Sequence, residues 1–301
     1  MNDNVIISVV MCVYNGSRFL KEAIDSILSQ TFTNFEFIIW NDGSTDNSEN
    51  IILSYNDSRI HYFYHENTGL GRALDMACRK ARGKYIARMD DDDISLSNRL
   101  EIEYNYMESH PECVMCFTPQ YFIDEDGDIV GELFTYTKDY ILKKLLLEAN
   151  CICHPSVMMR KDTYFMTQGY PGTRSAQDRL LWSKLGKLGK FANLKIPLIK
   201  YRIVSTSISN QYVQTSSYFQ MLLLLRRKMV LDNQFLEKDV ELYNLLISMI
   251  PRKKTPSVYK KHKEELVFFF LNVFLPESLA RNILLFFKNL YGYYKIHRMI
   301  D

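Results

Sequence analysis

Short apolar runs alternate with amphipathic segments over residues 1–95. The runs have the length and composition of buried strands, whereas the segments between them place apolar residues three and four positions apart, as helices do. The predicted strands cover residues 5–13, 35–40, 60–64 and 85–89, and the predicted helices cover 20–28, 46–55 and 72–81, with Gly83 ending the last helix. Short connections and right-handed crossovers turn this alternation into a doubly wound, mostly parallel sheet, so the predicted fold class is α/β.

The pattern becomes mixed beyond residue 95 and almost wholly helical beyond residue 205. Predicted helices cover 98–109 and 177–187, and predicted strands cover 113–118, 121–123 before an Asp126-Gly127 turn, 156–160, a segment near Phe191, and 198–203. We therefore expect one domain over residues 1–210, built from halves 1–95 and 96–210, and a helical carboxyl-terminal extension over residues 211–301.

Positive charge is concentrated at the carboxyl-terminal end. Residues 251–301 hold ten Lys/Arg and four Asp/Glu, a net charge of +6, which leaves −4 for residues 1–250. No basic stripe with interleaved aromatic residues runs through the body, so we expect no nucleic acid as a partner. The apolar runs 267–275 and 282–294 are too short to cross a bilayer. They favour helices lying on an anionic membrane surface, the alternative being packing against the domain or a second copy of the chain.

The amino terminus and the cysteines bear on location. Residues 1–10 carry acid ahead of their apolar run and no small-residue cleavage site, so we expect a cytoplasmic protein, peripheral on the inner face of the cell membrane. Six cysteines in 301 residues form no disulfide framework. A zinc site near Cys113 and Cys116 is disfavoured, because their spacing in a strand predicts thiols on opposite faces.

Polar clusters follow three of the predicted strands. They are Tyr14-Asn15-Gly16, Asn41-Asp42-Gly43-Ser44 and Asp90-Asp91-Asp92-Asp93. If the strand order is 3-2-1-4, all three face the crevice beyond the carboxyl ends of the strands, where such sheets bind ligands. Four adjacent carboxylates repel one another unless a cation holds them, and oxygen ligands suit Mg²⁺ or Mn²⁺, which also bridge phosphates. The alternatives are an acidic helix N-terminus for the aspartates and a simple turn for Asp42.

A glycine-rich segment, Thr68-Gly69-Leu70-Gly71-Arg72, follows the third predicted strand. Leu74 stands where a dinucleotide fingerprint needs its third glycine, which argues against a nicotinamide enzyme. We instead expect a tight turn that brings backbone N–H groups and Arg72 to the crevice.

Six segments occur in the order found in glycosyltransferase family 2, and the chain resembles that family over residues 5–205. They are SVVMCVYN, WNDGSTDNS, NTGLGRALDMA, MDDDDIS, HPSVMMRK and AQDRLLW. An ordered set is far more specific than any one member. The resemblance implies the GT-A fold, a first half that binds the nucleotide sugar and a second half on the acceptor side. It also implies a metal-dependent sugar transfer with inversion, with UDP the commonest donor nucleotide.

The resemblance also assigns roles to individual residues. Donor-binding residues would be Val13, Tyr14, Asn15, Asp42, Arg72, Asp90 and Asp91, with Asp42 on the base and Asp90 towards the ribose. Asp92 resembles the metal ligand, and Asp90 and Asp93 are further candidates. Asp178 resembles the base that takes the acceptor's proton, although capping of its predicted helix would also explain it. Candidates on the acceptor side are His154, Gln177, Arg179, Trp182 and Arg202.

The chain departs from the family pattern in one place. Val204 stands where relatives often carry a histidine that binds metal or phosphate, so the diphosphate would rest on Thr206, Ser207 or Arg202. Polymer-forming relatives carry a QxxRW segment, whereas this chain reads DRLLW over residues 178–182, which favours transfer of a single sugar. By resemblance, the acceptor is a saccharide or lipid-linked saccharide and the product a bacterial surface polysaccharide or lipid-linked oligosaccharide.

Two other functions stay open. A sugar nucleotidylyltransferase uses similar ligands but normally has Gly-Thr-Arg in a glycine-rich first loop, whereas residues 14–17 read YNGS. A nucleotide-sugar-binding or scaffold protein without turnover is compatible with Val204 in place of the family histidine.

Overall fold

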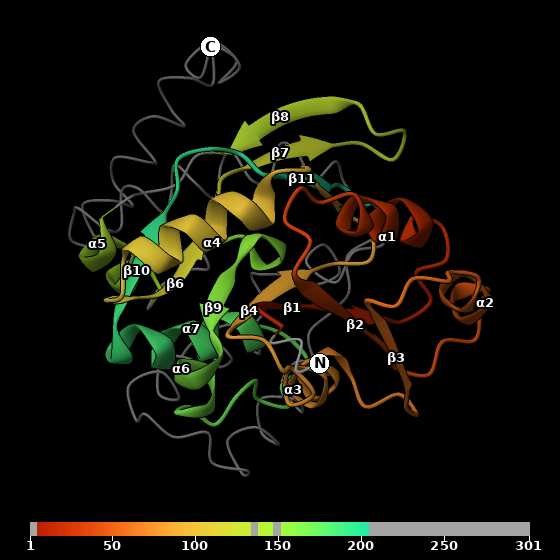
Figure 1. The fold of residues 1–301 in the computed structure, drawn as a ribbon, viewed down its shortest axis with the longest axis horizontal. Coiled ribbons are helices and arrows are strands. Elements are labelled where there is room, and N and C mark those ends of the chain that lie inside the picture. The colour runs from red at the N-terminus through yellow and green to blue at the C-terminus, as the bar shows by residue number, and fades with distance from the viewer. Residues whose placement is uncertain (1–4, 134–137, 147–151, 205–301) are drawn as a thin grey trace, which may run out of the picture. The chain divides into compact units, whose positions relative to one another are not determined.

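The computed structural model describes residues 5–133, 138–146 and 152–204 (Figure 1). The predicted extension over residues 211–301, its basic tail, Thr206 and Ser207 lie outside the described residues, so the boundary at residue 210 and the membrane-binding helices stay predictions. Within the described residues, no helix is long and apolar enough to span a membrane.

A seven-stranded sheet forms the centre of the structure. Its strand order is β10-β6-β9-β4-β1-β2-β3, and neighbouring strands are parallel except β9, which runs antiparallel to both β4 and β6. The order 3-2-1-4 predicted for the first four strands is confirmed. The strands are β1 (Ile7–Val13), β2 (Phe35–Asn41), β3 (Ile60–Tyr64), β4 (Tyr85–Met89), β6 (Cys113–Phe117), β9 (Met158–Arg160) and β10 (Lys190–Asn193).

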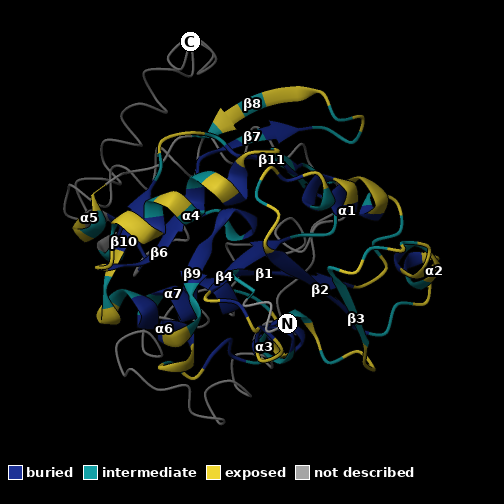
Figure 2. Cartoon of the chain, in the orientation of Figure 1, coloured by how far each residue is buried: buried dark blue, intermediate teal, exposed yellow. Residues whose placement is uncertain are grey.

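Helices cover both faces of this sheet because its central strands are apolar on both sides. β1 and β2 are buried along their whole lengths, as Figure 2 shows. Helix α1 packs Leu20, Ala23, Ile24 and Ile27 against one face, at the helical spacing that predicted it. That face also carries α2 and α4, and the other face carries α3 and α7. The helices are α1 (Leu20–Leu28), α2 (Ser48–Leu53), α3 (Leu70–Cys78), α4 (Arg99–Ser109) and α7 (Gln177–Leu188).

A smaller sheet, ordered β5-β11-β7-β8, carries the residues that follow the aspartate run. β5 (Ile94–Ser95) pairs antiparallel with β11 (Ile199–Arg202), which pairs parallel with β7 (Gln120–Ile123). β7 and β8 (Ile129–Leu133) form a hairpin, and Gly127 has φ 92° at the predicted turn. Neither β5 nor β8 was predicted, because β5 has only two residues and β8 is mostly exposed. Helices α5 (Asp139–Leu145) and α6 (Lys161–Phe165) are too short to show a clear helical period.

Two local predictions were wrong. Helix α3 ends at Cys78 rather than near Gly83. A Cβ atom at Gly83 would lie 2.7 Å from the backbone nitrogen of Ser8, so this glycine permits close packing against β1. Cys113 and Cys116 belong to the same side of the core. Their strand is bulged opposite β10, which places both thiols on one face despite the three-residue spacing.

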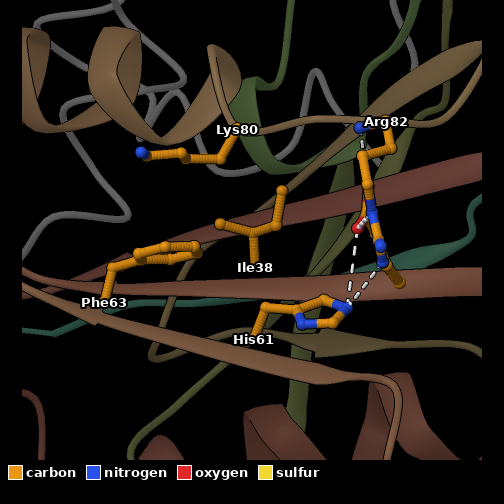
Figure 3. Close-up of a pocket in the computed structure, with 6 residues that line it drawn as sticks. Ile38, His61, Phe63, Lys80 and Arg82 are labelled. Atoms are coloured by element: carbon orange, nitrogen blue, oxygen red, sulfur yellow. Dashed lines mark hydrogen bonds and ion pairs between the residues drawn. The ribbon is translucent and has the colours of Figure 1, made fainter.

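A pocket of about 200 Å³ lies beside β2, β3 and the segment after α3, away from the polar strand ends (Figure 3). Buried Glu36 forms its polar wall and accepts hydrogen bonds from Ser8 Oγ at 2.6 Å and from Arg82 N and Nε, both at 2.7 Å. Arg82 Nη2 also lies 2.8 Å from Nε2 of His61. The carboxylate therefore joins β1, β2 and the segment that leads into β4.

Replacing Glu36 with Gln should lower the free energy of unfolding by about 2 kcal/mol at pH 7, because charge-assisted bonds to a buried carboxylate are lost. Burial raises the pKa of Glu36, but hydrogen bonds from Ser8 and Arg82 and the charge of Arg82 outweigh burial and hold the pKa below its usual 4.5. The contribution is present above pH 4.5 and is lost as the pH falls through the lower folded value. Urea unfolding of the two proteins should therefore converge in acid.

Lys21→Met is the control, since it removes an exposed ion pair with Asp25 and should change stability by less than about 0.5 kcal/mol. Equal stability of Glu36→Gln and the wild type at pH 7 would contradict the role of Glu36.

Candidate active site

The loops after β1 and β2 are bound to each other. Asn15 has a left-handed backbone, with φ 55°, and its N–H donates to Ser44 Oγ at 3.1 Å. Thr45 N donates to Asn15 Oδ1 at 2.8 Å, and Gly16 N donates to Ser48 Oγ at 3.2 Å. The first two polar clusters thus lie side by side, and the side chain of neighbouring Tyr14 is 54% exposed.

Asp42 is buried and holds the start of α3. Its Oδ1 accepts hydrogen bonds from Thr68 N and Oγ1, both at 3.0 Å, and its Oδ2 accepts one from Gly69 N at 2.9 Å. Its own N–H donates to the carbonyl oxygen of Val13 at 2.9 Å, and the Val13 side chain is buried. Both carboxylate oxygens already have protein donors, so the predicted contact to a base has to use their remaining lone pairs.

The start of α3 packs against the segment before α7. A Cβ atom at Gly71 would lie 2.3 Å from the carbonyl oxygen of Pro171, and one at Gly172 would lie 2.9 Å from Nε of Arg72. The glycine-rich segment therefore serves close packing, and it brings Arg72 beside the residues that lead to Asp178. This α3–α7 seam joins the first half of the domain to the second.

The aspartate run follows β4 and lies against the loop after β1. A Cβ atom at Gly16 would lie 2.0 Å from Oδ2 of Asp91, so only glycine leaves room for that carboxylate. Asp90 forms an ion pair with the buried side chain of Arg88. The clusters that follow strands one and four therefore meet, as their places in the sheet predicted.

Burial and mutual repulsion disfavour the charged forms of three of these carboxyl groups. Burial raises the pKa of Asp92 to about 7, and the charge of Asp90 adds to the shift. The pKa values of Asp91 and Asp93 are also raised, first by burial and then by the neighbouring carboxylates. A cation arriving among these groups would relieve their repulsion.

Carboxylate oxygens in this position fit a hard divalent cation. The described residues hold no group of three or more His, Cys, Asp and Glu side chains that could form a complete cage. Mg²⁺ sites that act on phosphates normally use one or two carboxylates, with substrate oxygens and waters completing the shell. Partly exposed Asp90 and Asp92 suit that arrangement, whereas Asp93 is 1% exposed and is bonded to β11.

Arg202 clamps the aspartate run to α1 and to the β7–β8 hairpin. Its N–H donates to Asp93 Oδ1 at 2.7 Å, and its Nε donates to the carbonyl oxygen of Asp92 at 2.9 Å. Nη1 donates to the carbonyl oxygen of Asp124 at 3.1 Å, and Nη2 pairs with Glu22. Each guanidinium nitrogen has a protein partner, so the contacts give no support to Arg202 as a diphosphate ligand.

His154 lies in a buried aromatic group next to the aspartate run. Its Nε2 shares a hydrogen bond with the hydroxyl of Tyr170 at 2.9 Å, and its ring stands edge-on to Trp182 with centroids 5.7 Å apart. Burial and the charge of Arg88 lower the pKa of His154 well below its usual value, which favours neutral imidazole. His154 and Trp182, both candidates on the acceptor side, thus form a packed wall.

Asp178 lies in the first turn of α7. The residue before the helix, Ala176, has φ 57°, and Asp178 Oδ1 accepts a hydrogen bond from Arg179 N at 2.7 Å. The helix N-terminus favours a carboxylate there. Gln177 and Arg179 are also buried, and Arg179 Nε donates to the carbonyl oxygen of Leu146. Arg179 therefore contacts the residue that follows α5, and its expected role on the acceptor side stays a prediction.

The sequence matches the model of glycosyl transferase family 2 over residues 8–165, more than half of the chain. The chain belongs to glycosyltransferase family 2. It is 36% identical over 208 residues to an uncharacterised glycosyltransferase of Methanocaldococcus jannaschii, which covers 67% of this chain and 72% of that protein. It is 34% identical over 222 residues to the O-antigen biosynthesis glycosyltransferase WbnJ of Escherichia coli, which covers 71% of this chain and 87% of WbnJ.

Solved structures show that this glycosyltransferase has the predicted GT-A fold. S. aureus TarS in complex with UDP-GlcNAc aligns with a TM-score of 0.63 at 18% identity, covering 89% of this chain and 79% of TarS. The mannosyltransferase PcManGT of Pyrobaculum calidifontis, in complex with GDP-Man and Mn²⁺, aligns with a TM-score of 0.55 at 13% identity. That match covers 80% of this chain and 69% of PcManGT. At such identities the likeness concerns the fold alone.

Arg88 of this glycosyltransferase was not among the residues predicted for the site. Arg88 lies in the otherwise apolar strand β4 and is 1% exposed. A signal was available, because a cation inside a buried strand and two positions before an acidic residue shares the face of that residue.

Replacing Arg202 with Met should destabilise the glycosyltransferase by about 3 kcal/mol, because the carbonyl oxygens of Asp92 and Asp124 lose buried, charge-assisted hydrogen bonds, whereas half-exposed Glu22 contributes little. Urea unfolding at fixed ionic strength measures the effect. Arg18→Met is the matched control: Arg18 pairs with Glu125 of the same hairpin, but its side chain is 62% exposed, so the change should stay within about 0.5 kcal/mol. Unchanged stability with loss of UDP binding would instead show that Arg202 serves the donor.

Proposed function

We propose that the chain transfers a single sugar, with inversion at the anomeric carbon, from a UDP donor to a hydroxyl of a saccharide or lipid-linked saccharide. The observation that carries this proposal is the contact of the aspartate run with the loop after β1, where Asp91 lies against Gly16. The α3–α7 seam adds the second support, because it brings Arg72 beside the segment that leads to Asp178. Together these contacts support one site, because they bring residues proposed for the donor close to the segment that leads to the proposed base.

The donor would lie across the loops that follow β1, β2 and β4. The exposed ring of Tyr14 and the loop at Asn15 would receive the nucleotide, with its base towards Asp42. Arg72 and the N–H groups at the start of α3 would add positive potential for the phosphates. Asp92, together with Asp90, would hold Mn²⁺ or Mg²⁺, which supplies charge to offset the departing diphosphate. PcManGT was solved with Mn²⁺, which supports the choice of a divalent metal.

Asp178 would act as the base. A sugar hydroxyl is a weak nucleophile, so Asp178 takes its proton while the hydroxyl oxygen attacks the anomeric carbon. The new C–O bond forms as the bond from that carbon to the diphosphate oxygen breaks, and the electron pair of that bond leaves with the nucleoside diphosphate. Attack on the face opposite the leaving group inverts the configuration. The first turn of α7 favours the ionised carboxylate that this step needs.

The relatives favour a role in making a bacterial surface polysaccharide. WbnJ acts in O-antigen biosynthesis by name, and TarS was solved with UDP-GlcNAc. We place the enzyme in the cytoplasm, peripheral on the inner face of the membrane, with the basic residues of 251–301 at the anionic surface or at a contact between two copies.

Incubation with a panel of nucleotide sugars and saccharide acceptors, read by mass spectrometry, should show transfer from a UDP-sugar in the presence of Mn²⁺ and a loss of at least about tenfold with chelator. Asp92→Asn should lose the response to Mn²⁺, whereas Asp57→Asn, whose carboxylate pairs with Arg59 in the turn before β3, should keep it. Release of pyrophosphate in place of nucleoside diphosphate would favour a nucleotidylyltransferase. Donor binding without any product would favour a binding or scaffold protein.

Asp178→Asn should lower kcat by about a thousandfold and change the Kd for UDP by less than about threefold, because the amide cannot take the acceptor's proton. Asp162→Asn is the matched control, since Asp162 is an exposed acid in the first turn of α6. Its rate should stay within about twofold of the wild type. An unchanged rate for Asp178→Asn would assign the base elsewhere.

A further inference from the structure

Arg88 and Arg99 are the most deeply buried arginines of the described residues, and they differ in how their nitrogens are paired. Arg99 bonds Glu103 through Nε at 3.0 Å, and its Nη2 donates to the carbonyl oxygens of Arg88 and Val157. Arg88 pairs with Asp90, but its Nε and Nη1 have no hydrogen-bond partner within the described part of the chain. The contacts of Arg99 are those expected of a cation that stabilises the fold, whereas Arg88 has two nitrogens left to bind a ligand.

Arg88 lies next to the aspartate run on the face of the sheet that carries α3 and α7. Asp90 directly follows the last residue of β4, two positions after Arg88, and the ion pair shows that the two side chains lie on the same side. The charge of Arg88 also acts on Cys12, His154 and Tyr170. The guanidinium group thus lies among the end of β1, the 3₁₀ turn His154–Ser156 and the segment before α7.

A fixed cation in this place has opposite effects on two kinds of ligand. It repels a second cation and competes with that cation for Asp90, whereas it attracts an anion. The N–H groups of these two unpaired nitrogens suit the oxygens of a phosphate, and charged hydrogen bonds of this kind are strong when buried. An arginine kept buried with two unmet donors is costly unless a ligand completes its bonding.

We propose that Arg88 couples the binding of the divalent cation to the binding of the donor. While the donor is absent, Arg88 keeps the affinity of the aspartate run for the cation low. When cation and nucleoside diphosphate arrive together, Arg88 supplies charge to the diphosphate and offsets its repulsion from the aspartates. Arg88 is thus a positioning residue, and this inference rests on the proposed function, because it requires both ligands to share the site.

The test measures two constants on the full chain at pH 8: Mn²⁺ affinity without nucleotide, by electron paramagnetic resonance, and UDP affinity at saturating Mn²⁺, by calorimetry. Arg88→Met should bind Mn²⁺ about tenfold more tightly than the wild type and UDP about tenfold more weakly. Arg88→Lys keeps the charge and should stay within about threefold of the wild type for Mn²⁺. Lys84→Met is the matched control: it removes a cation at the other end of β4 that is 54% exposed, and both constants should stay unchanged.

A gain in cation affinity separates this role from a merely structural one, since a damaged site binds Mn²⁺ more weakly. Equal or weaker Mn²⁺ binding by Arg88→Met would overturn the inference. If circular dichroism shows that Arg88→Met does not fold, Arg88→Gln replaces it, and the same two constants are compared with those of Arg88→Lys. A wild type that binds neither Mn²⁺ nor UDP would overturn the proposed function as well, whereas wild-type binding of both with an unaffected variant would overturn this inference alone.

Discussion

Repulsion among four adjacent carboxylates, at a place where the protein limits access of water, is the constraint on which the rest of the site depends. Residues from three separate elements reduce or accommodate this repulsion. Arg88 pairs with Asp90 from within β4, Arg202 brings a backbone N–H to Asp93 from β11, and Gly16 leaves space for Asp91 beside β1. The pKa values of Asp91, Asp92 and Asp93 remain raised in spite of these contacts, because burial has the largest effect on them. The protein therefore compensates the negative charge of the aspartate run only in part, and a bound cation would compensate the rest.

The first half of the fold was predictable because its signals are local and repeated. Buried strands such as β1 and β2 are apolar along their lengths, and α1 repeats its apolar residues at helical spacing. The strand order 3-2-1-4 was a hypothesis based on doubly wound folds, and the meeting of the polar strand ends was predicted on that condition. Strand β9 is different, since its insertion between β4 and β6 depends on pairing across a long stretch of chain that no local pattern records.

The sequence predicted which types of residue gather at the candidate site, but it did not predict most of the hydrogen bonds that these residues make. Asp42 reaches Thr68, 26 residues away, and Arg202 reaches Asp92 over 110 residues. A carboxylate or guanidinium group that suits a nucleotide also suits a backbone N–H or carbonyl of the protein, and composition does not distinguish the two uses. Arg202 and Arg179 illustrate this, because both were expected near the substrates and both bond to backbone carbonyl oxygens, so their roles towards a substrate stay predictions. Arg88 differs from both, because two of its nitrogens have no partner in the described part of the protein.

The α3–α7 seam restricts how the two halves of the domain can change in evolution or by engineering. No side chain fits between Gly71 and the carbonyl oxygen of Pro171, so a second half grafted from a relative must carry a matching segment before its α7. A bulkier segment would push the start of α3 outward. This shift would weaken the hydrogen bonds that Thr68 N and Gly69 N donate to Asp42. Chimeras that alter acceptor preference would therefore keep donor recognition only when these two surfaces are exchanged as a pair.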